Sequence, residues 1–463
     1  MQPQSPNTYH PTPNLEMHRR IINLTLPSIV SNITVPLLGL VDTAITGHMG
    51  EARYIGAIAV GSMVFNIMYW LFAFLRMGTG GMTAQAYGRK DFGEAELTGL
   101  RAISISLLIG LAIIILQYPL LHLAMWFIAP DENVMQLVYS YCYICIWGAP
   151  ASLGLFALNG WFVGMQNTKI PMLISITQNV VNILVSLLLV YCLKMKIEGV
   201  ALGTLIAQWA GFIMGSFFFI KKSSRVIGVR CWVLAYRSNH QHPSPNTQHP
   251  SSIFEPTAMK AFFTVNRDIF LRTLFLVSVN LYFVAAGAKD GDIILAVNTI
   301  LMQFFILYSY FMDGFAYAAE ALCGRFYGAG DMTSLKETIR KVFYWSIGIT
   351  AIYSVVYGIG GLDFLRLLTD EENVVSASEE YIFWAILIPI AGMVAFVWDG
   401  VFIGMTMTRG MLSGTFVAAI VFFTTYFSLE TTLHNHALWF AFILYLAARG
   451  VTQSVYWKME NEK

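Results

Sequence analysis

Twelve long apolar segments run through this chain, and they limit its possible folds more than any other feature. About 20 consecutive apolar residues form a helix long enough to cross the hydrocarbon core of a bilayer. The segments are continuous and lack the alternation of lipid-facing barrel strands. We predict membrane-spanning helices at roughly 21–47, 54–78, 100–128, 135–163, 170–193, 199–220, 269–288, 293–318, 342–368, 378–404, 411–430 and 436–457.

The composition agrees with a membrane protein and excludes several other classes. Of the 463 residues, 56% are hydrophobic and 12% are charged, and the mean hydropathy is +0.61. Soluble domains carry about 25% charged residues, so this chain could not cover the surface of a soluble protein of its length. The net charge of +1 gives no field that would attract a nucleic acid. We therefore expect an all-α polytopic membrane protein without enzymatic activity and without a nucleic-acid partner.

The basic residues predict the orientation of the helices and the division of the chain. Most of the 28 Lys and Arg residues fall on one side if the N-terminus is cytoplasmic, and positively charged segments face the cytoplasm. We expect a multi-pass protein of the plasma (inner) membrane with both termini in the cytoplasm. The predicted parts are a polar tail (1–20), an N-lobe (21–220), a cytoplasmic inter-lobe loop (221–262), a C-lobe (263–457) and a C-terminal tail (458–463).

The two halves of the chain resemble each other at an offset of 240 residues. Tyr87-Gly88 and Asp91 align with Tyr327-Gly328 and Asp331, and residues 159–165 align with residues 399–405. Internal duplication is frequent in secondary transporters. Because each half holds six predicted spans, both halves have the same orientation. This arrangement predicts two lobes related by a pseudo-two-fold axis along the membrane normal, with a cavity between them.

An acidic residue in the first predicted span is the leading candidate for a functional site. Asp42 lies in the apolar segment 38–44, downstream of Pro27 and Pro36. A charge near the bilayer centre costs about 2.5–3.5 kcal/mol on insertion scales, so a charged residue at this depth is expected to have a functional or structural role. Since proline removes a helix hydrogen bond and permits a bend, we interpret Asp42 as a protonatable carboxylate on a bendable helix. The alternative is an Asp that only forms a structural hydrogen bond near the outer interface.

The eighth predicted span carries two further acids. Asp313 and Glu320 are seven residues apart, so they share one helix face and could together attract a cation. Alternatively, Glu320 lies near the cytoplasmic end of its helix and pairs with Arg325 or Arg272.

Three more polar residues fall within predicted spans. Asp399 occupies the repeat position of Asn159, and both precede a glycine, so either can line the interface between the lobes. Arg76 is interpreted as a counter-ion or as a cation whose side chain reaches the inner interface.

Several of these strings resemble a known transporter family. Residues 31–44, SNITVPLLGLVDTA, closely resemble the first span of the DinF-like branch of the MATE (multidrug and toxic compound extrusion) transporters. Residues 266–269 with Arg272, residues 313–317, and Asp399-Gly400 with residues 402–404 resemble the same branch. The resemblance implies twelve helices in two six-helix lobes that form a V-shaped cleft. It also implies export of amphipathic, often cationic, compounds in exchange for protons or Na⁺.

The resemblance assigns roles to particular residues of this chain. Asp42 would be the protonation site of the N-lobe, with Asn182 and Thr204 in the hydrogen-bond network around it. The family often has an Asp where this chain has Ser186, which weakens a Na⁺ site and favours a single-carboxylate proton switch. The candidate substrate-cavity residues are Asn159, Asp313, Glu320, Asp399 and Arg272.

Two other transport functions and an enzymatic function are alternatives to proton-coupled export. A Na⁺-coupled exporter is one alternative, and a flippase of lipid-linked precursors from the same superfamily is another. Such a flippase would need a strongly cationic cavity to hold a pyrophosphate, whereas the predicted intramembrane charges are mostly acidic. An intramembrane enzyme is disfavoured because no H-E-x-x-H motif occurs. We expect a monomer with amphipathic small-molecule substrates and no cofactor or metal; His240, His242 and His249 are interpreted as part of a solvated linker.

Overall fold

The computed structural model describes residues 13–47, 52–129, 131–237, 253–369 and 371–462. The predicted inter-lobe His cluster therefore lies outside the described residues. The first half of the described chain, called the N-lobe here, consists of nine α-helices. They are α1 (Pro13–Gly47), α2 (Ala52–Leu71), α3 (Phe74–Gly88), α4 (Phe92–Ile115), α5 (Gln117–Ile128), α6 (Glu132–Cys145), α7 (Ala149–Gly164), α8 (Lys169–Leu187) and α9 (Ile197–Arg237).

The second half, called the C-lobe, consists of seven α-helices. They are α10 (Pro256–Lys289), α11 (Asp292–Gly328), α12 (Met332–Leu368), α13 (Glu372–Glu379), α14 (Ile382–Gly404), α15 (Thr408–Leu433) and α16 (Asn435–Asn461). Among the described residues, eleven helical segments are long and apolar enough to cross a membrane. Helix α1 adds a twelfth of 35 residues, about 50 Å long at 1.5 Å per residue. The predicted all-α fold with twelve long spans is confirmed.

Three of the predicted spans are built from two helices. The second span breaks between α2 and α3, where Phe72 and Ala73 bond to carbonyls three residues back. The fourth span passes from α6 through a 3₁₀ turn into α7, whose first turn contains Pro150. Proline has no backbone N–H and fits the first turn of a helix, which places the break there. The third span is divided in the same way between α4 and α5.

The two lobes repeat the same local geometry at the offset of 240 residues. Asp91 caps α4 by accepting a bond from the Glu94 amide, and Asp331 caps α12 through Ser334. The turn after α7 places Gln166 at φ 61°, and the turn after α14 places Thr406 at φ 54°. Two non-glycine residues in this uncommon region at equivalent positions show that the repeat extends to backbone conformation.

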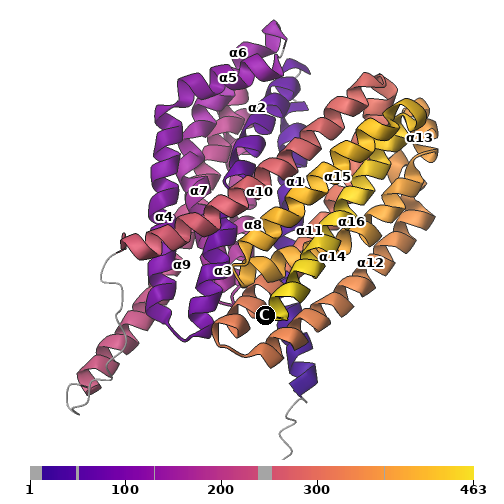
Figure 1. Cartoon of the computed structure of the whole chain (residues 1–463). Coiled ribbons are helices and arrows are strands. Elements are labelled where there is room, and N and C mark those ends of the chain that lie inside the picture. The colour runs from indigo at the N-terminus through magenta and orange to yellow at the C-terminus, as the bar shows by residue number, and fades with distance from the viewer. Residues whose placement is uncertain (1–12, 48–51, 130, 238–252, 370, 463) are drawn as a thin grey trace, which may run out of the picture.

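The lobes meet at the end of the molecule that holds the start of α1 and the end of α16, which we call the base (Figure 1). There α3 and α11 cross with almost no space between them. A Cβ on Gly88 would clash with the carbonyl oxygen of Arg325, and a Cβ on Gly328 would clash with that of Gln85. Because Gln85 and Arg325 are equivalent in the two repeats, this crossing is itself pseudo-symmetric.

The first helix of each lobe reaches into the other lobe. Met17, Ile21 and Leu24 of α1 belong to the core of the C-lobe, while Phe262 of α10 belongs to the core of the N-lobe. Helix α1 already begins at Pro13, within the segment predicted as a tail, and α9 continues to Arg237, beyond the predicted end of the sixth span. The long helices therefore extend past the apolar segments that identified them.

Close helix packing makes a prediction for the C-lobe. A Cβ on Gly404 of α14 would clash with the Glu320 carbonyl oxygen and lie 2.8 Å from the Gly324 nitrogen. Overpacking of this kind costs about 1–3 kcal/mol, so Gly404→Ala should lower the melting temperature of the purified protein.

The matched control is Gly348→Ala on α12, where no atom lies within 4 Å of the added Cβ. Alanine is a better helix former than glycine, so this variant should melt at the wild-type temperature or slightly above it. Equal melting temperatures for the two variants would contradict the packing assigned to Gly404.

Candidate functional site

The predicted coupling residue Asp42 lies near the end of α1 that is distant from the base. It is partly buried, and its Oδ1 atom is buried without a hydrogen-bond partner among the described residues. The carboxylate interacts electrostatically with the side chains of Tyr141 and Cys145 on α6, which are both buried. Asp42 is therefore an acid enclosed by the N-lobe, with no cation paired to it in the described part of the chain.

Helix α8 brings further polar groups to the same level. It packs beside α1, where Asn179 donates a 2.8 Å bond to the Thr34 carbonyl, and Ser186 lies about two turns farther along, as Asp42 does. Asn182 is fully buried and donates a 3.1 Å bond to the Thr204 hydroxyl of α9. The structure thus brings Asn182 and Thr204 together. The Asn182 Oδ1 and Ser186 Oγ atoms are buried and unpartnered within the described residues.

The two prolines of α1 lie inside one uninterrupted helix. Pro27 is buried, Pro36 is exposed, and α1 remains helical through both. Each proline removes a backbone donor from the helix ladder. Pro36 lies between the base-proximal half of α1, which packs in the C-lobe, and Asp42, so it is positioned where a bend would move the acid.

The C-lobe buries an ionic network centred on Asp399 of α14. Arg272 of α10 donates to its Oδ2 atom, Arg449 of α16 donates to the same atom at 2.6 Å, and Gln453 donates to Oδ1 at 2.7 Å. Asp399 is 7% exposed, and the two arginines are 4% and 5% exposed. Asp399 is therefore fully engaged and does not offer a free carboxylate to a cationic substrate.

A second ion pair joins the two lobes. Arg76 of α3 donates a 3.1 Å bond to Glu320 of α11, and its guanidinium lies 4.2 Å from the centre of the Tyr317 ring. Neither of the partners proposed for Glu320, Arg325 or Arg272, forms this pair. Arg76 is the counter-ion of an acid 244 residues away in the sequence.

Asp313 lies between these two ionic groups. It is partly exposed and interacts electrostatically with Arg76, Arg272 and Arg449, yet it forms no ion pair in the described ranges. Asn159, the repeat counterpart of Asp399, has a buried Oδ1 atom that no described residue contacts by a hydrogen bond. Of the three acids predicted to line a substrate cavity, Asp313 alone keeps a carboxylate without an ion pair to another described residue.

The acidic excess expected among the intramembrane charges is small. Arg272 and Arg449 both lie inside long helices and are buried around Asp399. With Arg76 they balance the three acids Asp313, Glu320 and Asp399. Arg449 was missed as a site residue although it falls within the last predicted span, where a charge is itself the signal of a partner.

Two repeated lobes of membrane-spanning helices with buried charges at their interface define a secondary-transporter architecture. Comparison with known proteins identifies the family: the model of the MatE family matches residues 27–188 and 269–426. The chain belongs to the MatE family.

Individual relatives agree with this assignment. DNA damage-inducible protein F of Escherichia coli is 35% identical over 94% of this chain and 91% of its own length. The probable multidrug resistance protein NorM of Photorhabdus laumondii is 23% identical over 79% of this chain and 77% of its own. A crystal structure of a mutant of the Vibrio cholerae MATE transporter VcmN superposes with a TM-score of 0.83 at 16% identity, covering 98% of this chain and 99% of that one. The structural neighbour is named as a transporter, and the NorM relative as a probable multidrug resistance protein.

The Asp399 network predicts a stability effect. Asp399→Asn would leave two buried guanidinium groups without their carboxylate, which costs about 3–5 kcal/mol for a buried ion pair. We expect the purified variant to melt at a markedly lower temperature in detergent, whether the sample contains a cationic dye, a neutral dye or no ligand.

Asp363→Asn is the control, because Asp363 is exposed and forms only a 3.4 Å surface pair with Arg366. That substitution should change stability by less than about 0.5 kcal/mol. If Asp399→Asn melted like the control, the network would not be the structural element described above.

Proposed function

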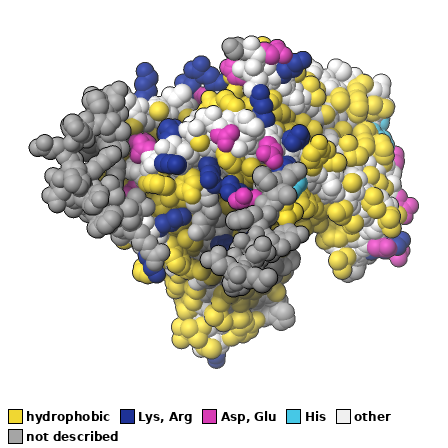
Figure 2. Space-filling view, turned by 90° about the horizontal axis from the view of Figure 1, so that it is seen from below, with side chains coloured by type: hydrophobic (Ala, Val, Ile, Leu, Met, Phe, Trp, Pro, Cys, Tyr) yellow, Lys and Arg dark blue, Asp and Glu magenta, His cyan; other side chains and the backbone are white. Residues whose placement is uncertain are grey.

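We propose that this MatE protein is an antiporter that exports amphipathic cations in exchange for protons. Family membership supports transport of small molecules through a multi-pass membrane protein. The exchange of a proton at Asp42, the cationic substrate, a monomeric state and location in the inner membrane with the base toward the cytoplasm are our proposals. The numerous basic side chains on the base support that orientation (Figure 2).

The observation that carries the proposal is the unpartnered carboxylate of Asp42. An ionised carboxylate away from water needs a paired charge or several hydrogen-bond donors. The described residues supply neither to Oδ1 of Asp42. A bound proton neutralises the Asp42 carboxylate, and its release restores the negative charge. Proton binding can therefore drive a change in the packing of α1.

Na⁺ exchange is the second candidate, and one observation favours it. The Asn182 Oδ1 and Ser186 Oγ atoms are unpartnered acceptors on α8, which packs against α1, and hard cations prefer oxygen ligands. The lack of a second carboxylate argues for the proton, since Ser186 brings no negative charge to offset that of a metal ion.

Asp313 supports a cationic substrate. It is an unpaired acid among the described residues, beside the charge-matched pair of Arg76 and Glu320 and beside the network in which two arginines share Asp399. A flippase for a pyrophosphate-linked lipid would need an excess of cations, whereas three arginines here face three acids. The arginines are thus not in excess, and the unpaired carboxylate of Asp313 is the group that supports binding of a positive charge on an amphipathic molecule.

A proton gradient can supply the energy for this export. Exchange of one proton for a singly charged cation moves no net charge across the membrane, so the difference in pH drives it, at about 1.4 kcal/mol or a tenfold concentration ratio per pH unit. Protonation of Asp42 from outside would bend α1 at Pro36 and release the substrate. Loss of the proton to the cytoplasm would return the helix to its starting form.

The proposal predicts the behaviour of Asp42→Asn. Asparagine keeps the shape of the side chain but cannot exchange a proton, so the variant should fold and bind a cationic dye. Its gradient-driven dye efflux from proteoliposomes should fall to the rate of protein-free vesicles. Wild-type efflux should follow an imposed proton gradient and should not require Na⁺.

Asp363→Asn serves again as control, since it removes an exposed acid, and it should transport at the wild-type rate. Proton-driven efflux by Asp42→Asn at the wild-type rate would refute the role of Asp42. Strict Na⁺ dependence of the wild type would refute the choice of ion and favour the second candidate.

A separate prediction concerns Asp313. Asp313→Asn removes the unpaired charge while leaving both ion pairs intact, so binding of a cationic dye should weaken about tenfold, the equivalent of 1.4 kcal/mol. Binding of a neutral dye of similar size should stay unchanged in a fluorescence titration of the purified protein. Equal weakening for both dyes would make Asp313 a structural residue.

A further inference from the structure

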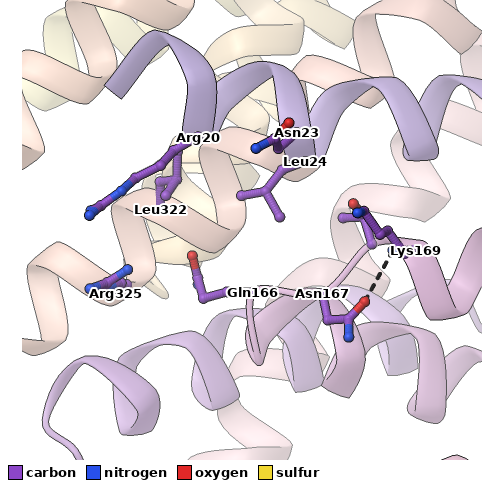
Figure 3. A pocket seen from close by; sticks show the side chains of 9 residues that line it. Arg20, Asn23, Leu24, Gln166, Asn167, Lys169, Leu322 and Arg325 are labelled. Atoms are coloured by element: carbon purple, nitrogen blue, oxygen red, sulfur yellow. Dashed lines mark hydrogen bonds between the residues drawn. The ribbon is translucent and has the colours of Figure 1, made fainter. Parts of the chain in front are cut away.

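A cavity of about 400 Å³ opens at the base between the two lobes. It is formed by α1, the α7–α8 turn and the start of α8 from the N-lobe, and by α11 from the C-lobe (Figure 3). The lining residues are Arg20, Asn23, Leu24, Gln166, Asn167, Thr168, Lys169, Leu322 and Arg325. None of them belongs to the site around Asp42 or to the Asp399 network.

The charge of this cavity is strongly positive. Arg20, Lys169 and Arg325 line it, and no acidic residue does. Arg20 pairs with Glu16 one turn away on α1, while Lys169 and Arg325 form no ion pair within the ranges that the structure describes. In Figure 3, Arg20 and Arg325 lie on one side of Gln166, and Lys169 lies on the other.

The buried polar atoms of this cavity are also unsatisfied. Thr168 is 2% exposed, and its hydroxyl has no hydrogen-bond partner among the described residues. The Gln166 amide donates at 2.6 Å to the carbonyl of Ala321 in the other lobe, and its Oε1 atom is left without a partner there. Unpaired buried polar atoms cost free energy. Of these two, only the Thr168 hydroxyl can donate to an anion, because an amide oxygen is an acceptor.

In the second repeat, another side chain of the protein accepts the hydrogen bond for which the Thr168 hydroxyl has no partner. Thr408, the counterpart of Thr168, donates a 3.0 Å bond to Asp268, which Arg267 also binds at 2.8 Å. The cavity beside Thr408 contains two acids, Asp268 and Glu460, and one cation, Arg409. In the first repeat, Ser28 stands where Asp268 stands in the second, and it donates to its own helix.

We propose that this cavity binds an oxyanion of the phosphate class, which takes the place that the Asp268 carboxylate holds in the second repeat. Arg fits a phosphate group with paired donors, and Lys and Thr supply single ones. The phosphate is either free or the phosphodiester of a phospholipid headgroup. Because its partners come from both lobes, the bound anion stabilises the arrangement in which the lobes meet at the base.

The test is a ligand-induced shift in melting temperature of the full-length protein in uncharged detergent. The probes are inorganic phosphate, a short-chain phosphatidylglycerol, and an uncharged glycolipid of the same chain length. We expect one or both phosphate probes to raise the melting temperature and the uncharged lipid not to. A response to phosphatidylglycerol alone indicates the lipid source, and a response to inorganic phosphate indicates the free ion.

Two variants remove the proposed contacts. Arg325→Gln should lower the affinity for the responding probe roughly tenfold, as expected for loss of one charge-assisted hydrogen bond. Thr168→Val should also weaken it, yet should leave the ligand-free melting temperature unchanged or higher, because the lost hydroxyl has no partner in the described chain.

The second repeat provides matched controls. Thr408→Val loses the bond to Asp268, so it should lower the ligand-free melting temperature while keeping the wild-type response to the probe. Arg409→Gln should keep both. The proposal is overturned if neither phosphate probe shifts the wild type, or if Thr168→Val and Arg325→Gln respond as the wild type does.

Discussion

The cost of holding a charge away from water governs the interior of this protein. An ionised side chain in a membrane must find an opposite charge or a proton, because neither lipid nor apolar side chains can solvate it. Arg272 and Arg449 both form ion pairs with Asp399, and Arg76 of the N-lobe forms one with Glu320 of the C-lobe. These ion pairs tie α3 to α11, and they tie α10, α14 and α16 to one another, so the positions of four C-lobe helices depend on buried charges.

Close packing of small residues supplies the second constraint. The lobes cross where Gly88 faces Arg325 and Gly328 faces Gln85, and neither glycine has room for a methyl group. In lipid the hydrophobic effect contributes little to the association of helices. Van der Waals contact between closely approaching backbones therefore provides much of the attraction. The crossing holds the lobes at the base, where Gln85 and Gln166 also donate hydrogen bonds to the opposite lobe.

The sequence predicted those parts of the structure that depend on neighbouring residues. Apolar length located all twelve spans, and the offset of 240 residues located turns that the structure repeats at Gln166 and Thr406. It did not predict which charges would pair. Arg76 and Glu320 are brought together only by the crossing of α3 and α11, and Arg449 and Asp399 only by the packing of α16 against α14. The Asn182–Thr204 bond was expected only from the family resemblance, and it joins two helices whose contact no local pattern specifies.

The two repeats share a backbone but differ in their charges. In the common register, Asp399 corresponds to Asn159, Arg272 to Asn32, Glu320 to Gly80 and Asp313 to Ala73, while Asp42 corresponds to Tyr282. The C-lobe therefore carries an ionic network that the N-lobe lacks, and the N-lobe carries an isolated acid that the C-lobe lacks. A carboxylate inside a dense network responds weakly to one proton, because its neighbours already compensate its charge. An isolated carboxylate has no such compensation, so the coupling site proposed for the N-lobe and the ionic network of the C-lobe occupy different halves of one duplicated fold.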